Sequence, residues 1–128
     1  MVHRSLVSVV DDDESVRESL PDLLRQFGFA AQAFSSGEAF LASDVVGDTS
    51  CLLLDLAMPG MSGDEVLERL AADPATAQIP VVIVTSHEVD APTRARLESR
   101  ARAVLHKRDL SIETLGRTLD AIEGRAVH

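Results

Sequence analysis

The chain has 128 residues, 45% of them hydrophobic and 26% charged, with a formal net charge of −9. This length predicts one domain spanning residues 1–128, and no apolar run approaches the ~20 residues that a membrane span needs. The acidic charge argues against direct nucleic-acid binding, which needs a basic surface.

Apolar runs and helical periodicity alternate along the whole chain. In chain order, the predicted elements are strand 6–10, helix 15–27, strand 29–34, helix 35–41, strand 51–54, helix 62–73, strand 79–84, helix 90–100, strand 103–106 and a last helix capped by Ser111. Residues 46–50 read as a loop. Five alternations of strand and helix predict an α/β fold with a parallel sheet and helices on both sides.

A proline, a glycine and a cysteine in or beside these elements lead to further predictions. Pro21 lies inside the first helix, where a proline removes a backbone donor, so we expect a kink or a different helix boundary. Gly28 follows that helix as a C-terminal cap would. Cys51 is the only cysteine and starts the third strand, which predicts a buried thiol without an internal disulfide, as in the reducing cytoplasm.

Polar residues stand where four of the predicted strands end. Asp11 and Asp12 follow the first strand, Asp55 the third, Thr85 the fourth and Lys107 the fifth. In a parallel sheet these ends share one edge, where open α/β folds bind ligands. Three carboxylates together repel one another, and a hard divalent cation such as Mg²⁺ would relieve this. A hydroxyl and an ammonium beside them suit the oxygens of a transferred phosphoryl group.

Lys107 is the only lysine of the chain, since the other eleven basic residues are arginines. An ammonium is a compact charge with rotatable donors, unlike the planar guanidinium. A lysine at this strand end therefore indicates that the site requires an ammonium group rather than a guanidinium.

Four stretches of the sequence resemble the receiver domains of two-component response regulators, the group that includes the single-domain chemotaxis regulator. They are Val9-Val10-Asp11-Asp12-Asp13-Glu14-Ser15-Val16-Arg17, Leu53-Leu54-Asp55-Leu56-Ala57-Met58-Pro59-Gly60-Met61-Ser62-Gly63, Val82-Ile83-Val84-Thr85-Ser86, and Lys107. The stretch from Asp55 to Gly63 is fairly specific, and the order and spacing of all four make the resemblance strong.

The resemblance implies a flavodoxin-like, doubly wound sheet of five strands in the order 2-1-3-4-5, with five helices. It implies that Asp55 is the phosphoacceptor, supplied by a histidine kinase or phosphotransfer protein. Asp12, Asp55 and the backbone carbonyl of Ala57 would hold Mg²⁺, with Asp11 reaching it directly or through water. Lys107 would pair with the phosphoryl group. Thr85 would turn toward it and so switch the surface of the fourth helix, fifth strand and fifth helix.

Three positions depart from the family pattern. Arg108 replaces the proline that usually follows the lysine through a cis bond, so we expect a trans Lys107–Arg108 bond and a rearranged loop. Val104 replaces the usual aromatic switch residue and has no ring to swing. Arg100 replaces a glycine often found at the end of the fourth helix, so we expect a different cap there.

Two other functions compete with the phosphorylatable switch. One is a phosphate-independent, receiver-like interaction module, which would use the six basic residues between Arg94 and Arg108 as a docking face. The same residues also suit a plain solvated helix face. The other is an aspartate-nucleophile phosphatase, but its second aspartate would stand at Ala57, which cannot transfer a proton. We therefore expect a cytoplasmic signalling protein and no enzyme, with a possible homodimer through the fourth helix, fifth strand and fifth helix.

Overall fold

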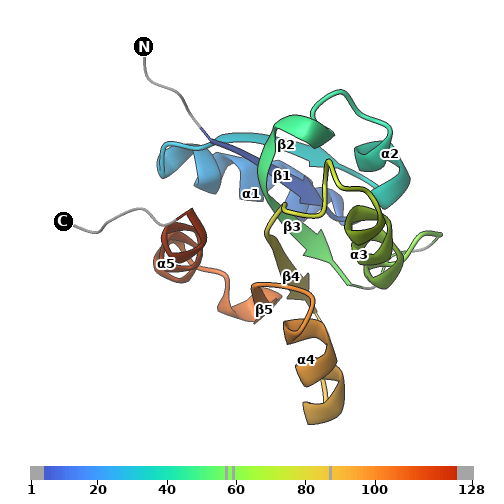
Figure 1. Ribbon diagram of the computed structural model, residues 1–128. Coiled ribbons are helices and arrows are strands. Elements are labelled where there is room, and N and C mark those ends of the chain that lie inside the picture. Colours follow the sequence, from blue (N-terminus) through green and yellow to red (C-terminus); the bar gives the residue numbers. More distant parts are fainter. Residues whose placement is uncertain (1–4, 57, 59, 87, 124–128) are drawn as a thin grey trace.

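The computed structural model describes residues 5–56, 58, 60–86 and 88–123. Strands and helices alternate along this part of the chain (Figure 1). The elements are β1 Leu6–Val10, α1 Glu14–Gln26, β2 Ala30–Phe34, α2 Gly37–Leu41, the 3₁₀ turn η1 Val46–Asp48, β3 Thr49–Asp55, α3 Gly63–Ala72, β4 Val81–Thr85, α4 Ala91–Glu98, β5 Ala103–His106, the 3₁₀ turn η2 Lys107–Asp109, and α5 Ile112–Glu123.

The five strands form one parallel sheet in the order β2-β1-β3-β4-β5, which confirms the predicted fold. β3 is the central strand, and all of its residues except Ser50 are buried. Its side chains alternate between the two faces of the sheet. Leu52 and Leu54 join one apolar core, while Cys51 and Leu53 join the other.

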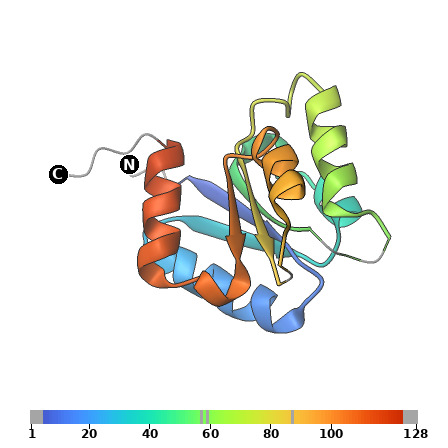
Figure 2. The ribbon, with the colours of Figure 1, turned by 90° about the horizontal axis from the view of Figure 1, so that it is seen from below.

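Helices cover both faces of the sheet, as Figures 1 and 2 show. One core packs the sheet against Phe40 of α2, Val66 of α3 and Leu97 of α4. The other packs it against Leu24 of α1 and Leu115 of α5. Among the described residues, no helix is long and apolar enough to cross a membrane.

Side-chain caps begin the helices where the sequence predicts them. Ser36, Ser62 and Asp90 each accept a backbone hydrogen bond from the first turn of α2, α3 and α4. Ser111 does the same for α5, accepting from the amide of Thr114 at 3.1 Å. After α1, Gly28 adopts a φ of +89°, the left-handed conformation that glycine tolerates best.

Most helix and strand ends differ from the predicted ones by one or two residues, and three places are informative. α1 runs from Glu14 to Gln26 as one helix that contains the buried Pro21. β3 begins at Thr49, inside the segment expected to be a loop, because the Thr49 hydroxyl is buried and lies 2.8 Å from the hydroxyl of Ser8 on β1. A polar side chain satisfied in this way gives no apolar signal. β4 begins at Val81 rather than at residue 79 and ends at Thr85.

Candidate functional site

The polar residues predicted to share one edge of the sheet do lie together there. Asp11 follows β1 directly, Asp55 is the last residue of β3, Thr85 is the last residue of β4, and Lys107 follows β5. In the strand register, Asp55 pairs with Val84, the neighbour of Thr85. Because the strands are parallel and adjacent, their carboxyl ends deliver these side chains to one place.

The chain turns sharply between β1 and α1, and this turn carries Asp11 and Asp12. The amide of Asp11 still donates to the carbonyl of Phe34 on β2, at 3.1 Å. Two residues later, the Asp13 carboxylate accepts from the amide of Ser15 at 2.9 Å and so caps α1. Asp12 is therefore held between the end of a strand and the cap of a helix.

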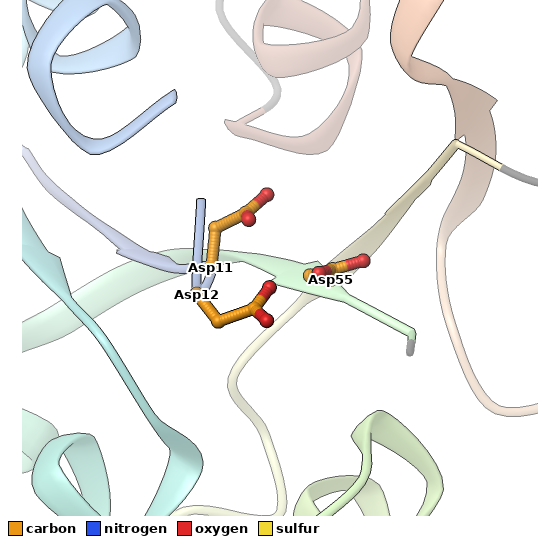
Figure 3. Close-up of side chains that lie close together, drawn as sticks. All are labelled: Asp11, Asp12 and Asp55. Atoms are coloured by element: carbon orange, nitrogen blue, oxygen red, sulfur yellow. The ribbon is translucent and has the colours of Figure 1, made fainter. Parts of the chain in front are cut away.

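Asp11, Asp12 and Asp55 form an acidic cluster. Each offers a carboxylate oxygen, and these oxygens lie within 4.8 Å of one another. Figure 3 shows Asp11 and Asp12 at the end of β1 beside Asp55 at the end of β3. Asp11 is 2% exposed and Asp55 is 4% exposed, whereas Asp12 faces solvent. Burial weakens the screening of the like charges, so their mutual repulsion is strong.

Lys107 supplies a positive charge to this cluster. Its Nζ lies 3.0 Å from Oδ2 and 3.3 Å from Oδ1 of Asp11, and 3.9 Å from Oδ2 of Asp55. Burial alone lowers the pKa of Lys107, but the hydrogen bond to Asp11 and the charges of Asp55, Asp11 and Asp13 raise the pKa above its usual value. The ammonium therefore stays charged at neutral pH.

The donor set fits a hard divalent cation. Three carboxylates and one ammonium leave two negative charges uncompensated among these four side chains. Carboxylate oxygens from a half-open site, with room for water, are the ligands that Mg²⁺ prefers. Asp12 provides the solvent-facing side of the cluster, and Asp11 and Asp55 provide its buried side. The predicted backbone ligand, Ala57, lies outside the described residues.

Two residues that support this site were part of the quoted stretches but were given no role in the sequence analysis. Gly63, at the start of α3, packs against the backbone behind Asp55: a Cβ there would lie 2.8 Å from the Asp55 carbonyl oxygen and 2.9 Å from the Leu56 Cα. The Ser62-Gly63 helix start could have indicated this close approach. Arg17 of α1 donates from Nη1 to the Asp11 carbonyl at 3.1 Å, and no pattern in the sequence pointed to that contact.

The three departures from the family pattern have structural counterparts. No cis peptide bond occurs among the described residues, so the predicted trans bond after Lys107 is confirmed, and this bond lies within the turn η2. Val104 is 6% exposed and belongs to the core. α4 ends without a left-handed residue, since Ser99 keeps helical dihedral angles and Arg100 donates to the Leu97 carbonyl.

The basic residues between Arg94 and Arg108 do not form one uniform free face. Arg96 pairs with Asp64 of α3 at 2.7 Å, and its pKa is raised by that hydrogen bond and charge. Arg94 pairs with Glu98 at 3.7 Å. Arg108 pairs with Glu88 at 2.7 Å. Acidic groups of the same chain thus neutralise much of the expected docking face.

Comparison with known proteins decides the family. Residues 7–118 match the family model described as the response regulator receiver domain. This chain belongs to that family. The receiver is 41% identical over 81 residues to the C4-dicarboxylate transport transcriptional regulatory protein DctR of Rhodobacter capsulatus, covering 63% of this chain and 41% of DctR. It is 43% identical over 81 residues to the transcriptional regulatory protein FixJ of Azorhizobium caulinodans, covering 63% of this chain and 37% of FixJ.

Solved structures agree with this assignment. A response regulator receiver protein from Burkholderia phymatum is 36% identical, with a TM-score of 0.79 over 97% of this receiver and 98% of that chain. The chemotaxis protein CheY4 of Vibrio cholerae has a TM-score of 0.82 over 94% of this receiver and 99% of that chain; at 22% identity it shows the shared fold alone. The aligned parts of DctR and FixJ, 41% and 37% of their lengths, show that the receiver spans about two-fifths of these relatives.

Proposed function

We propose that the receiver accepts a phosphoryl group on Asp55 from a histidine kinase or phosphotransfer protein. The observation that carries this is the placement of Asp55: it ends the central strand, is 4% exposed, and lies beside two carboxylates and the only lysine. In the transfer, an oxygen of Asp55 attacks phosphorus. The bond from phosphorus to the donor's histidine nitrogen breaks, and that nitrogen keeps the electron pair.

The neighbouring side chains have separate roles in this proposal. Asp11, Asp12 and Asp55 would hold Mg²⁺, with the Ala57 carbonyl as the further ligand that the resemblance implies. Bound there, Mg²⁺ would neutralise charge on the phosphoryl oxygens. Lys107, 3.9 Å from Asp55, would pair with a phosphoryl oxygen. Thr85, 2% exposed at the end of the neighbouring strand, would donate its hydroxyl to another.

We further propose that phosphorylation switches the surface of α4, β5 and α5. The chain leads from Thr85 into α4 and from Lys107 into α5, so groups drawn toward the phosphoryl group would pull on both segments. Arg94 of α4 also donates to the carbonyl of Val104 on β5, at 3.4 Å. Val104 lies in the core and has no aromatic ring that could change its position. The signal would therefore pass through polar contacts such as the one between Arg94 and Val104. The same surface would carry a homodimer.

The receiver would act in the cytoplasm as a signalling protein and not as an enzyme. We do not adopt the phosphate-independent module, because it would act through the arginine-rich face, and Arg94, Arg96 and Arg108 of that face pair with acids of the same chain. DctR and FixJ are transcriptional regulatory proteins. The net charge of −9 argues against direct DNA contact by this receiver.

Intact-mass measurement after incubation with acetyl phosphate and Mg²⁺ tests phosphorylation. The wild type should gain one phosphoryl group, and Asp55→Asn, which keeps the shape of the side chain, should gain none. Asp48→Asn, in the turn η1, is the matched control and should behave as the wild type. Omitting Mg²⁺ should abolish the adduct. A folded wild type that stays unmodified, or an Asp55→Asn variant modified at the wild-type rate, would contradict the proposal.

Self-association tests the proposed dimer. Arg96→Glu should remove a salt-sensitive dimer seen by sedimentation of the phosphorylated protein. Because this change also breaks the pair with Asp64, Asp64→Asn is needed as the control for that intrachain contact. A phosphorylated protein that is monomeric at every concentration would overturn the dimer.

A further inference from the structure

Asp12 differs from the other two members of the acidic cluster in how it is held. Its side chain faces solvent, and within the described residues it makes no hydrogen bond or ion pair of its own. Asp11, in contrast, is held by Lys107. The backbone that carries Asp12 therefore sets the direction of its Cα–Cβ bond and so the region that its carboxylate can reach.

That backbone is fixed on both sides of Asp12. On one side, Nη1 of Arg17 donates to the carbonyl of Asp11 at 3.1 Å. On the other, the amide of Asp13 donates to Oδ1 of Asp11 at 2.9 Å. The Asp11 carbonyl belongs to the planar peptide that joins Asp11 to Asp12. A guanidinium bound to this oxygen therefore fixes the plane from which the Asp12 side chain departs.

The start of α1 brings Arg17 to this position. The Arg17 amide donates to the carbonyl of Asp13 at 3.1 Å, which places Arg17 one turn into the helix. Long side chains on a helix lean back toward its N-terminus. The half-buried Arg17 side chain can therefore reach back across the turn to Asp11.

We propose that Arg17 is a positioning residue for the metal site, because it fixes the Asp11–Asp12 peptide and thereby aims the Asp12 carboxylate. This inference rests on the proposed function, in which Asp12 is a ligand of Mg²⁺. A role of Arg17 through its charge and a role through positioning predict opposite effects of its removal on the affinity for Mg²⁺. A guanidinium near a cation site repels the cation, so if Arg17 acted through charge alone, removing it would tighten Mg²⁺ binding. If Arg17 positions Asp12, its removal weakens binding.

Calorimetric titration of the whole receiver with Mg²⁺ distinguishes the two effects without any phosphorylation step. Arg17→Met keeps the apolar stem and the helix propensity but loses the donors, and it should bind Mg²⁺ about tenfold more weakly, the low end for a lost outer-shell contact to a metal ligand. Arg17→Lys keeps the charge but presents one point donor on a different geometry. Its affinity should lie between those of Arg17→Met and the wild type.

Arg25→Met is the matched control. Arg25 also belongs to α1 and also donates to a backbone carbonyl, that of Ala31 at 3.3 Å, but it lies in the last turn of the helix. It should bind Mg²⁺ as the wild type does. Equal weakening by Arg25→Met and Arg17→Met would mean that general loosening of α1 is responsible, and the inference would be wrong.

The remaining outcomes separate this inference from the proposed function. A wild type that binds Mg²⁺, with Arg17→Met binding equally or more tightly, overturns the positioning role and leaves the proposed function intact. A wild type without Mg²⁺ binding overturns both. If Arg17→Met fails to fold, Arg17→Lys decides: wild-type affinity there shows that charge suffices and overturns the inference, and weakened affinity supports it.

Discussion

The side chains of Glu88 and Arg108 form an ion pair of 2.7 Å that joins the segment after β4 to the segment after β5. Glu88 follows Thr85 by three residues, and Arg108 follows Lys107 directly. The pair thus connects the two chain segments that carry the hydroxyl and the ammonium of the site. Arg108 stands where the family usually has a proline.

A double-mutant cycle on Glu88→Gln and Arg108→Gln should measure a weak coupling. The two side chains are 77% and 64% exposed, so we expect about 0.2–1 kcal/mol in the free energy of unfolding by urea. The coupling should shrink in high salt, because exposed charges are screened. The charge-reversed pair, Glu88→Arg with Arg108→Glu, should recover it. A coupling that is unchanged by salt would contradict this account.

Gly63→Ala should displace the backbone that carries Asp55. The added methyl group would meet the Asp55 carbonyl oxygen and the Leu56 Cα, which are backbone atoms and cannot move aside as a side chain could. We expect a loss of about 1–3 kcal/mol in the free energy of unfolding and slower phosphorylation by acetyl phosphate.

Gly47→Ala is the control for that substitution. Nothing lies within 4 Å of a Cβ at Gly47, in the turn η1. This variant should keep the wild-type phosphorylation rate and lose no stability. Equal losses in both variants would show that close packing behind Asp55 is not the cause.

Lys107 should give the receiver a distinctive alkaline dependence of stability. Its pKa is raised in the folded protein, so the folded state holds this proton more tightly than the unfolded state. The stabilisation is complete below the unfolded-state pKa of about 10.4 and is lost as the pH rises through the higher folded-state pKa. Because the chain has no tyrosine and no other lysine, few other groups titrate there.

Urea unfolding with a metal chelator present, from about pH 9 to about pH 12, checks this dependence. The wild type should lose stability more steeply with rising pH than Lys107→Gln, which retains every other titrating group. Parallel curves for the two proteins would contradict the ion pair with Asp11.

Asp90 should give the opposite dependence in acid. Hydrogen bonds from the side chain and backbone of Thr93 lower the pKa of Asp90, which caps α4. Its stabilisation is present above the unfolded-state pKa and is lost as the pH falls through the lowered folded-state value. Asp90→Asn keeps a capping side chain that does not titrate. It should therefore lose less stability than the wild type on acidification, whereas Asp90→Ala should be less stable at neutral pH. Urea unfolding at several pH values measures both.

The fold and the cluster were predictable because the chemistry of each strand is local. Buried strands such as Val81–Val84 are recognised in the sequence as short apolar runs, and the polar residue that ends each run follows it directly. Parallel connectivity then brings Asp11, Asp55 and Lys107 to one edge. The start of β3 was missed because the contact there is distant in sequence: the hydroxyl of Thr49 lies 2.8 Å from the hydroxyl of Ser8, 41 positions away.

Pro21 is a case in which tertiary packing outweighs a local sequence signal. A proline in a helix interior costs about 3 kcal/mol, yet α1 continues through it. Pro21 is buried together with Leu20 and Leu24, so packing against the sheet outweighs the lost donor. The ion pair of Arg96 was unpredictable for a related reason. Its partner, Asp64, is 32 residues away, and a long flexible side chain carries no periodic signal of the contact it will make.

The thin attachment of α4 has a consequence for dynamics. This helix has 8 residues and buries only Leu97, whereas β1, β3 and β4, whose carboxyl ends meet at the candidate site, are buried along nearly their whole length. Local opening of α4 would expose little apolar surface, so its amides should exchange with solvent hydrogen through a subglobal event that depends weakly on denaturant. Amides of the three strands should exchange only on global unfolding. The receiver thus combines well-buried strands at the candidate site with a helix that is held by few buried contacts, so little free energy is needed to open that helix locally.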